Sequence, residues 1–176
     1  MIEPRFDEDQ LPTEEEVTQE TERILSRDVI AYHRVGDAAY GVKWMLYPVN
    51  SPQRAEVAEQ IARYFHKETG FDFPPYMVGD EGEDNPVYLV RSKASTTCVP
   101  IIAGAVGFQK VQSDWVLTWI WLHPWERGGR LVNAVFNTLD EVHGTFYIEG
   151  PVSNAMRGLM RKRQYDDSRV VRIERH

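Results

Sequence analysis

The residues with the clearest chemical potential lie in one short turn, from Leu122 to Leu131. Gly128 and Gly129 separate an apolar segment from an amphipathic one, and Arg127 and Arg130 flank them. Glycines let the backbone approach a ligand closely, and the N–H groups of a helix's first turn bind anions. The turn therefore fits a pyrophosphate, although a glycine pair after a strand is often only a turn. The spacing matches neither a P-loop nor a Gly-x-Gly-x-x-Gly dinucleotide fingerprint.

Four of the five tryptophans lie close to this turn, between Trp115 and Trp125. Such a group forms either an acceptor pocket with a cation–π surface or ordinary core packing. For Trp119 and Trp121, which lie inside an apolar segment, core packing is the favoured interpretation.

The sequence contains no recognisable metal-binding pattern. Cys98 is the only cysteine, and no two of the five histidines are four residues apart. These counts exclude a disulfide framework and a cysteine-based zinc site. There is no run of 18 or more apolar residues, and the acidic N-terminus lacks the apolar region of a signal peptide. We therefore expect no metal, no membrane association and a cytoplasmic location.

The turn must be positioned by the elements around it. Apolar patterning predicts helices over 52–69, 130–143 and 154–162, and strands at 40–49, 87–91, 100–111, 115–122, 145–149 and 170–173. Gln112-Ser113-Asp114 is expected to join two strands as a hairpin. Simple alternation puts Trp115, Leu117, Trp119 and Trp121 on one face of strand 115–122, and both faces are apolar. That strand is then central, and the whole is an α/β fold: a mixed sheet with helices on both faces.

These residues resemble a known family. The run from Trp119 to Leu131, WIWLHPWERGGRL, is similar to the central motif of the GNAT superfamily of acyl-CoA-dependent N-acyltransferases. That motif is a strand ending in hydrophobic-x-Pro, then two residues, then Arg/Gln-x-x-Gly-x-Gly/Ala at a helix start. Gly104–Phe108 looks like the family's preceding strand, and 151–162 looks like its last helix. The order of elements also matches over residues 40–175.

The resemblance implies a GNAT-like fold and a set of roles. Acetyl-CoA would be the co-substrate, with its pantetheine arm entering where the central strand separates from the next one near Leu122. The Leu122 N–H would polarise the thioester carbonyl, and Asn154 would lie beside the pantetheine arm. Phe73 and Tyr76 would form the acceptor-binding wall. The remaining cofactor-binding residues would hold the pyrophosphate: Arg127, Gly128, Gly129, Arg130 and Leu131.

The chain departs from the family pattern at three places. Arg130 stands where the motif has its first glycine and Val132 where it has its second small residue. Met160 stands where the family has a tyrosine general acid, and Tyr165 lies five residues further on. Gly128 and Gly129 restore the openness of the loop one or two positions early. Acyl transfer to an amine still requires a base that deprotonates the ammonium.

Glu149, at the end of the strand beside the central one, is the best-placed base, although it also fits a solvated strand-end charge. His123 is a second choice, but a histidine before proline is more often structural, and Asp114 belongs to the hairpin turn. We predict an acetyl-CoA-dependent N-acyltransferase that acetylates an amine of a small molecule or protein. The alternative is a catalytically lapsed GNAT-fold acyl-CoA-binding protein that acts through a protein partner.

The net charge of −7 belongs to the N-terminus. Residues 1–28 hold ten acids and three arginines, and the other 148 residues hold 17 acids and 17 bases. We therefore expect an acidic, partly helical arm over 1–30, with a capping box at Thr13–Glu16, and a GNAT-like domain over 31–176. The arm is either a solvated helix or a contact surface for a protein partner. Residues 157–176 are basic, which fits CoA phosphates or solvation better than nucleic acid.

Overall fold

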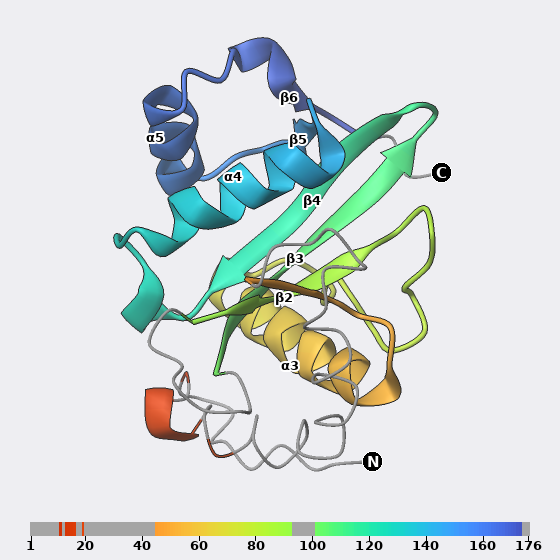
Figure 1. The fold of residues 1–176 in the computed structure, drawn as a ribbon, viewed down its shortest axis with the longest axis vertical. Coiled ribbons are helices and arrows are strands. Elements are labelled where there is room, and N and C mark those ends of the chain that lie inside the picture. Colours follow the sequence, from red (N-terminus) through yellow and green to blue (C-terminus); the bar gives the residue numbers. More distant parts are fainter. Residues whose placement is uncertain (1–10, 12, 17–18, 20–44, 93–100, 174–176) are drawn as a thin grey trace.

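The computed structural model describes residues 11, 13–16, 19, 45–92 and 101–173 (Figure 1). Most of the predicted arm, residues 40–44 of the first predicted strand and Cys98 lie outside the described residues, and the division at residue 30 stays a prediction. The capping box is confirmed. Thr13 Oγ1 accepts the Glu16 N–H at 3.3 Å, and the Glu16 carboxylate accepts the Thr13 N–H at 2.7 Å.

The described strands form one mixed sheet in the order β1-β2-β3-β4-β5-β6. Neighbours from β1 to β4 are antiparallel, whereas β4, β5 and β6 are parallel to one another. The last strand is shorter than expected, with only two residues at the sheet edge. The bounds are β1 (Leu46–Pro48), β2 (Val87–Arg91), β3 (Ile102–Val111), β4 (Asp114–Leu122), β5 (Tyr147–Glu149) and β6 (Val170–Val171).

Helix α3 (Pro52–Thr69) covers one face of the sheet, next to β2, β3 and β4 (Figure 1). Its ends are the predicted ones. Ser51 Oγ accepts the Arg54 N–H at 3.4 Å, and Gly70 ends the helix at a φ of 69°. The buried side chains at helical spacing pack against the sheet in one cluster with Trp119 and Trp121.

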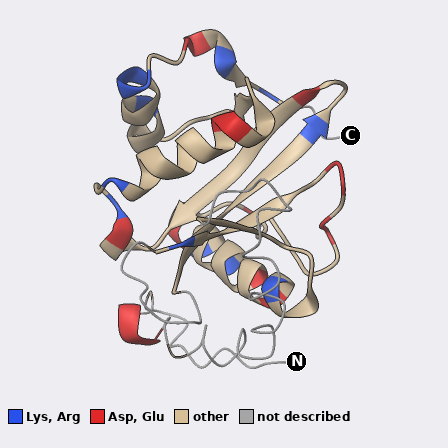
Figure 2. Cartoon of the chain, in the orientation of Figure 1, with Lys and Arg blue, Asp and Glu red and all other residues tan. Residues whose placement is uncertain are grey.

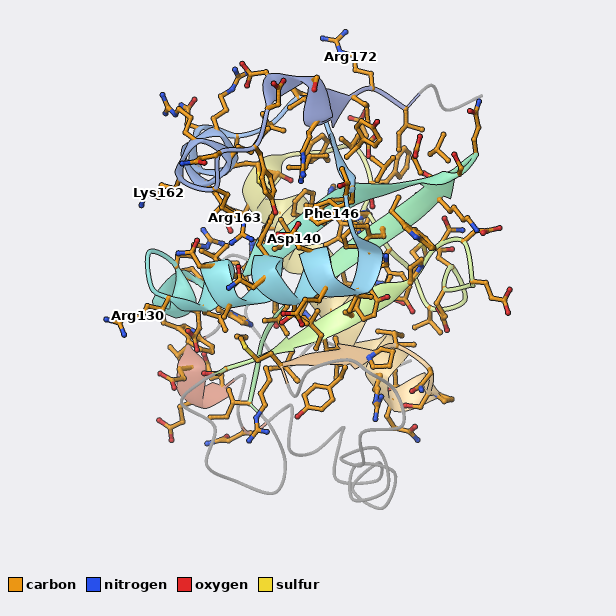
Figure 3. All side chains as sticks on the ribbon, turned by 45° about the horizontal axis from the view of Figure 1, so that its top comes forward. Arg130, Asp140, Phe146, Lys162, Arg163 and Arg172 are labelled. Carbon is orange, nitrogen blue, oxygen red and sulfur yellow. The ribbon has the colours of Figure 1, made fainter. Side chains whose placement is uncertain are left out.

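Helices α4 (Leu131–His143) and α5 (Asn154–Lys162) lie on the opposite face, where they share a second cluster with Leu117, Leu122 and Ile148. The short helices η3 (Pro124–Glu126) and η4 (Asp167–Arg169) precede α4 and β6. Arg163 joins α5 to α4, because its guanidinium contacts Asp140 at 2.7 Å (Figure 3). Helices therefore flank both faces, and the mixed α/β fold is confirmed.

A β-bulge in β4 corrects the predicted facing of its side chains. Gly107 pairs with Trp119 and Phe108 with Leu117, so Thr118 is an extra residue without a partner on β3. Its hydroxyl donates to the Gly107 carbonyl at 3.1 Å. The extra residue reverses the alternation: Trp115 and Leu117 face α4, whereas Trp119 and Trp121 face α3. The prediction that all four share one face is therefore wrong.

The hairpin before β4 is tighter than predicted. Val111 pairs with Asp114, so the loop is only Gln112-Ser113 and Asp114 is the first residue of β4. Gln112 has a φ of 57°, the left-handed conformation that two-residue hairpins require. Asp114 is therefore an exposed strand residue at the far end of β4 from Leu122.

Candidate functional site

The central feature of the site is the early end of the ladder between β4 and β5. The two strands pair only at Val116–Tyr147 and Leu117–Ile148, yet β4 continues for five more residues to Leu122. The separation begins at Thr118, which is also the bulged residue. We expected it near Leu122. The bulge turns the strand and ends its pairing with β5 earlier.

The backbone of Leu122 faces this separated side. The next residue, His123, donates its N–H to Ala103 on the β3 side at 2.8 Å. Since backbone groups alternate sides along an antiparallel strand, the N–H and carbonyl of Leu122 face away from β3. Its carbonyl accepts Arg127 Nε at 2.7 Å. The Leu122 N–H is therefore directed toward the side of β4 that β5 does not pair with.

The side chain of Arg127 forms an ion pair that joins the turn to α3. Its guanidinium lies 5.4 Å from the centre of the Trp121 ring and binds both carboxylate oxygens of Glu68, one of them at 2.6 Å. The Trp121 indole donates to the same carboxylate at 2.6 Å. The hydrogen bond from Arg127 is the main cause that lowers the pKa of Glu68. Glu68 was not predicted, because it is 59 positions away in sequence and no local pattern marks it.

The start of α4 has the open backbone that its glycines predict. Gly128 has a φ of 76°, and a side chain added there would meet nothing within 4 Å. The first helical bond is from the Ala134 N–H to the Arg130 carbonyl at 3.2 Å. The N–H groups from Gly128 to Asn133 have no acceptor on any described residue. The turn therefore fits an anion.

Leu131 and Arg130, at the start of α4, differ in how far their side chains are exposed. Leu131 is 1% exposed and anchors α4 in the core, so only its backbone is available to a ligand. Arg130 is exposed, caps no N–H with its side chain and points outward from the turn (Figure 3). Arg130 is therefore the side-chain cation available at the start of α4.

Glu149 ends β5 level with Thr118. Ile148 packs in the cluster beneath α4, so the neighbouring Glu149 faces the α3 side of the sheet. It is partly exposed and pairs with Val171 of β6. Asn154 is the exposed first residue of α5. The structure thus places Glu149 at the strand separation.

Of the two residues predicted to form the acceptor-binding wall, only one lines a pocket. Tyr76 is 2% exposed and lines a half-open pocket of about 360 Å³ on the α3 side of the sheet. Its hydroxyl donates to Glu81 at 2.5 Å, and burial, followed by that bond, raises its pKa. Phe73 is 80% exposed and does not line the pocket. Thr118 and Trp119 of the bulge also line it.

Three other residues considered for proton transfer are not free for it. Met160, which has no proton to donate, is 3% exposed in the cluster that α4 and α5 share, and the Tyr165 hydroxyl contacts both oxygens of Asp140 at 2.7 Å. His123 is 1% exposed and lies between the rings of Trp121 and Trp125, at 4.5 and 5.1 Å. Burial lowers the pKa of His123 to about 3. The structural interpretation of His123 is therefore favoured.

The buried His123 makes stability depend on pH. Its pKa is about 3 in the folded chain and about 6.5 unfolded, so the unfolded chain binds the extra proton and acid favours unfolding. We expect the wild type to lose unfolding free energy relative to the His123→Phe variant, by about 1.4 kcal/mol for each pH unit between about 6 and about 4. Urea unfolding across this range measures it. A pH-independent difference would contradict the lowered pKa.

Comparison with protein-family models gives no match, and comparison with curated proteins gives none. Among the helices that the structure describes, none has both the length and the apolar composition needed to cross a bilayer. Within the same described ranges, no three His, Cys, Asp or Glu side chains gather as a metal site requires.

Proposed function

We propose that the chain is an acyltransferase of the GNAT type, which transfers an acetyl group from acetyl-CoA to an amine. The observation that carries this proposal is the end of the β4–β5 ladder at Leu117 and Ile148. Beyond this point, one edge of β4 no longer pairs with β5, and the strand continues to the turn that contains the two glycines before α4. An extended pantetheine arm that pairs with β4 would occupy the position of a strand.

The glycine turn supports the phosphate end of this proposal. Six consecutive N–H groups, from Gly128 to Asn133, lack acceptors on described residues: three precede α4 and three belong to the first turn of this 13-residue helix. The helix dipole and these groups together favour a pyrophosphate. The expected role of Arg127 in holding the phosphates is not supported, because its side chain is bound to Glu68 and its N–H donates to the Pro124 carbonyl at 3.2 Å. Arg130 would contribute the charge.

The chemistry would involve two groups of this chain. The Leu122 N–H would donate a hydrogen bond to the carbonyl oxygen as negative charge develops on it. Glu149 would accept a proton from the ammonium through water, because it lies level with Thr118, four residues before Leu122 along β4. The amine nitrogen then forms a bond to the carbonyl carbon and the carbon–sulfur bond breaks. The proton that the nitrogen loses as it becomes an amide passes through solvent to the leaving thiolate.

A second candidate function is binding without catalysis, with the chain acting through a protein partner. Buried Met160 and the engaged Tyr165 hydroxyl favour it, since neither supplies the acid that a leaving thiolate would use. Calorimetric titration with acetyl-CoA and CoA tests what both candidates share. No binding at millimolar ligand would overturn both. Turnover with any amine from a broad panel would exclude the second.

Arg130 provides a direct test of the phosphate site. We expect Arg130→Glu to weaken CoA binding about tenfold, because it replaces the exposed cation at the helix start with an anion. Arg172→Glu is the matched control: it makes the same charge change at an exposed arginine that points elsewhere (Figure 3). Calorimetry measures both affinities. Equal losses in the two variants would mean that only the overall charge matters.

A further inference from the structure

The pocket on the α3 side of the sheet has the lining of a recognition site. Its floor comes from three adjacent strands, with Val87 of β2, Phe108 and Gln109 of β3, and the bulge residues Thr118 and Trp119 of β4. The loop between α3 and β2 closes one side. Its volume of about 360 Å³ falls at the lower end of the range for small-molecule pockets.

The loop that forms this side is held in place by carboxylates. Glu59 of α3 accepts the Val78 N–H at 2.9 Å, and Asp80 accepts the Met77 N–H at 2.8 Å. Glu81 accepts both the Tyr76 hydroxyl and the Gly79 N–H, the latter at 3.0 Å. These bonds fix the positions of Tyr76 and Asp80 in the pocket wall. The pocket is therefore preformed.

The loop that borders the pocket carries only negative charge. The loop over 71–86 holds five acids and no base, and Figure 2 shows its red stretch beside the sheet. No lysine or arginine lines the pocket, and Arg63, the nearby cation of α3, is paired with Glu59 at 2.6 Å. The negative charges of Glu81, Asp80 and Glu59 contribute to the raised pKa of Tyr76. A cation is the ligand that this field favours.

The lining combines aromatic and polar groups in the way that ammonium ions need. Tyr76 and Trp119 contribute aromatic surface, which attracts cations. Asp80 contributes a carboxylate, and the side-chain amides of Asn85 and Gln109 contribute carbonyl oxygens. An ammonium group has three N–H donors and no acceptor, so these oxygens match it.

The pocket is also next to the proposed transfer site. Thr118 lines it and marks the point where β4 separates from β5. Glu149 faces the same side of the sheet, one strand away and at the level of Thr118. An amine in this pocket would therefore lie beside β4, next to the residue at which the strand separation begins.

We propose that this pocket binds the acceptor of the reaction and that the acceptor is a small primary amine in its ammonium form. That this amine is the acceptor of the reaction rests on the proposed function. Binding of the amine itself can be measured without acetyl-CoA. The size of the pocket and its closure by the loop favour a small molecule over a protein chain.

Calorimetry with the full chain tests this inference, with 1,4-diaminobutane and phenylethylamine as probes. We expect each amine to bind at neutral pH and its uncharged alcohol analogue, 1,4-butanediol or 2-phenylethanol, to bind at least about tenfold more weakly. Asp80→Asn should weaken amine binding about fivefold to tenfold. Glu83→Gln makes the same charge change in the same loop outside the lining, and it should leave the affinity within about twofold.

The outcomes separate this inference from the proposed function. Equal binding of amines and alcohols, or equal losses in Asp80→Asn and Glu83→Gln, overturns the cationic pocket. CoA binding without amine binding overturns the pocket and leaves the proposed transferase standing. Amine binding without CoA binding supports the pocket and overturns the transferase.

Discussion

The substitution Glu149→Gln is expected to lower kcat by about 10²- to 10⁴-fold, the usual contribution of a general base. The amide has nearly the shape of the carboxylate but cannot accept the proton of the attacking ammonium. Glu149 lies at the end of β5, level with Thr118 and on the face of the acceptor pocket. Steady-state kinetics with the best amine of the panel measure the effect.

Asp114→Asn is the control for this variant. It makes the same carboxylate-to-amide change at the opposite end of β4, where Asp114 is exposed beside the hairpin. Both variants should bind CoA as the wild type does. A Glu149→Gln variant with unchanged kcat would mean that Glu149 is not the base. A wild type that binds CoA but acetylates nothing would favour the binding protein instead.

The largest effect on stability is expected from Gly104→Ala. Gly104 lies opposite Leu122, and a Cβ added there would be 2.1 Å from the Trp121 carbonyl oxygen and 2.9 Å from the Leu122 Cα. Both atoms belong to the backbone, so no side-chain rotation relieves the overlap, and β3 and β4 must move apart. We expect a loss of about 3 kcal/mol of unfolding free energy.

Gly82→Ala is the matched control for Gly104→Ala. A Cβ at Gly82 would meet nothing within 4 Å, so the same substitution should change stability by less than about 0.5 kcal/mol. Urea unfolding of the three proteins measures both effects. Similar stabilities for the two variants would contradict the close approach of β3 and β4 at Gly104. The displaced strands should also weaken CoA binding, because Leu122 lies at this contact.

Local patterns predicted most of the elements correctly. Ser51 and Gly70 mark the two ends of α3, and Ser153 caps α5 by accepting the Met156 N–H at 3.2 Å. These signals work because capping depends on residues within one turn of the helix. The bulge at Thr118 left no such signal. Its position depends on the pairing with Gly107, which is eleven residues away, and so the facing of Trp115 and Leu117 was predicted wrongly.

The candidate site divides in the same way. The sequence by itself determined the glycine turn, the open start of α4 and the position of Glu149 at a strand end, because each follows from neighbouring residues. Only the tertiary structure decided that Glu68 binds Arg127, that His123 is enclosed by aromatic rings and that Asp80, Gln109 and Trp119 line one pocket. These contacts join residues from separate elements. They arise when the elements pack, and no spacing along the chain encodes them.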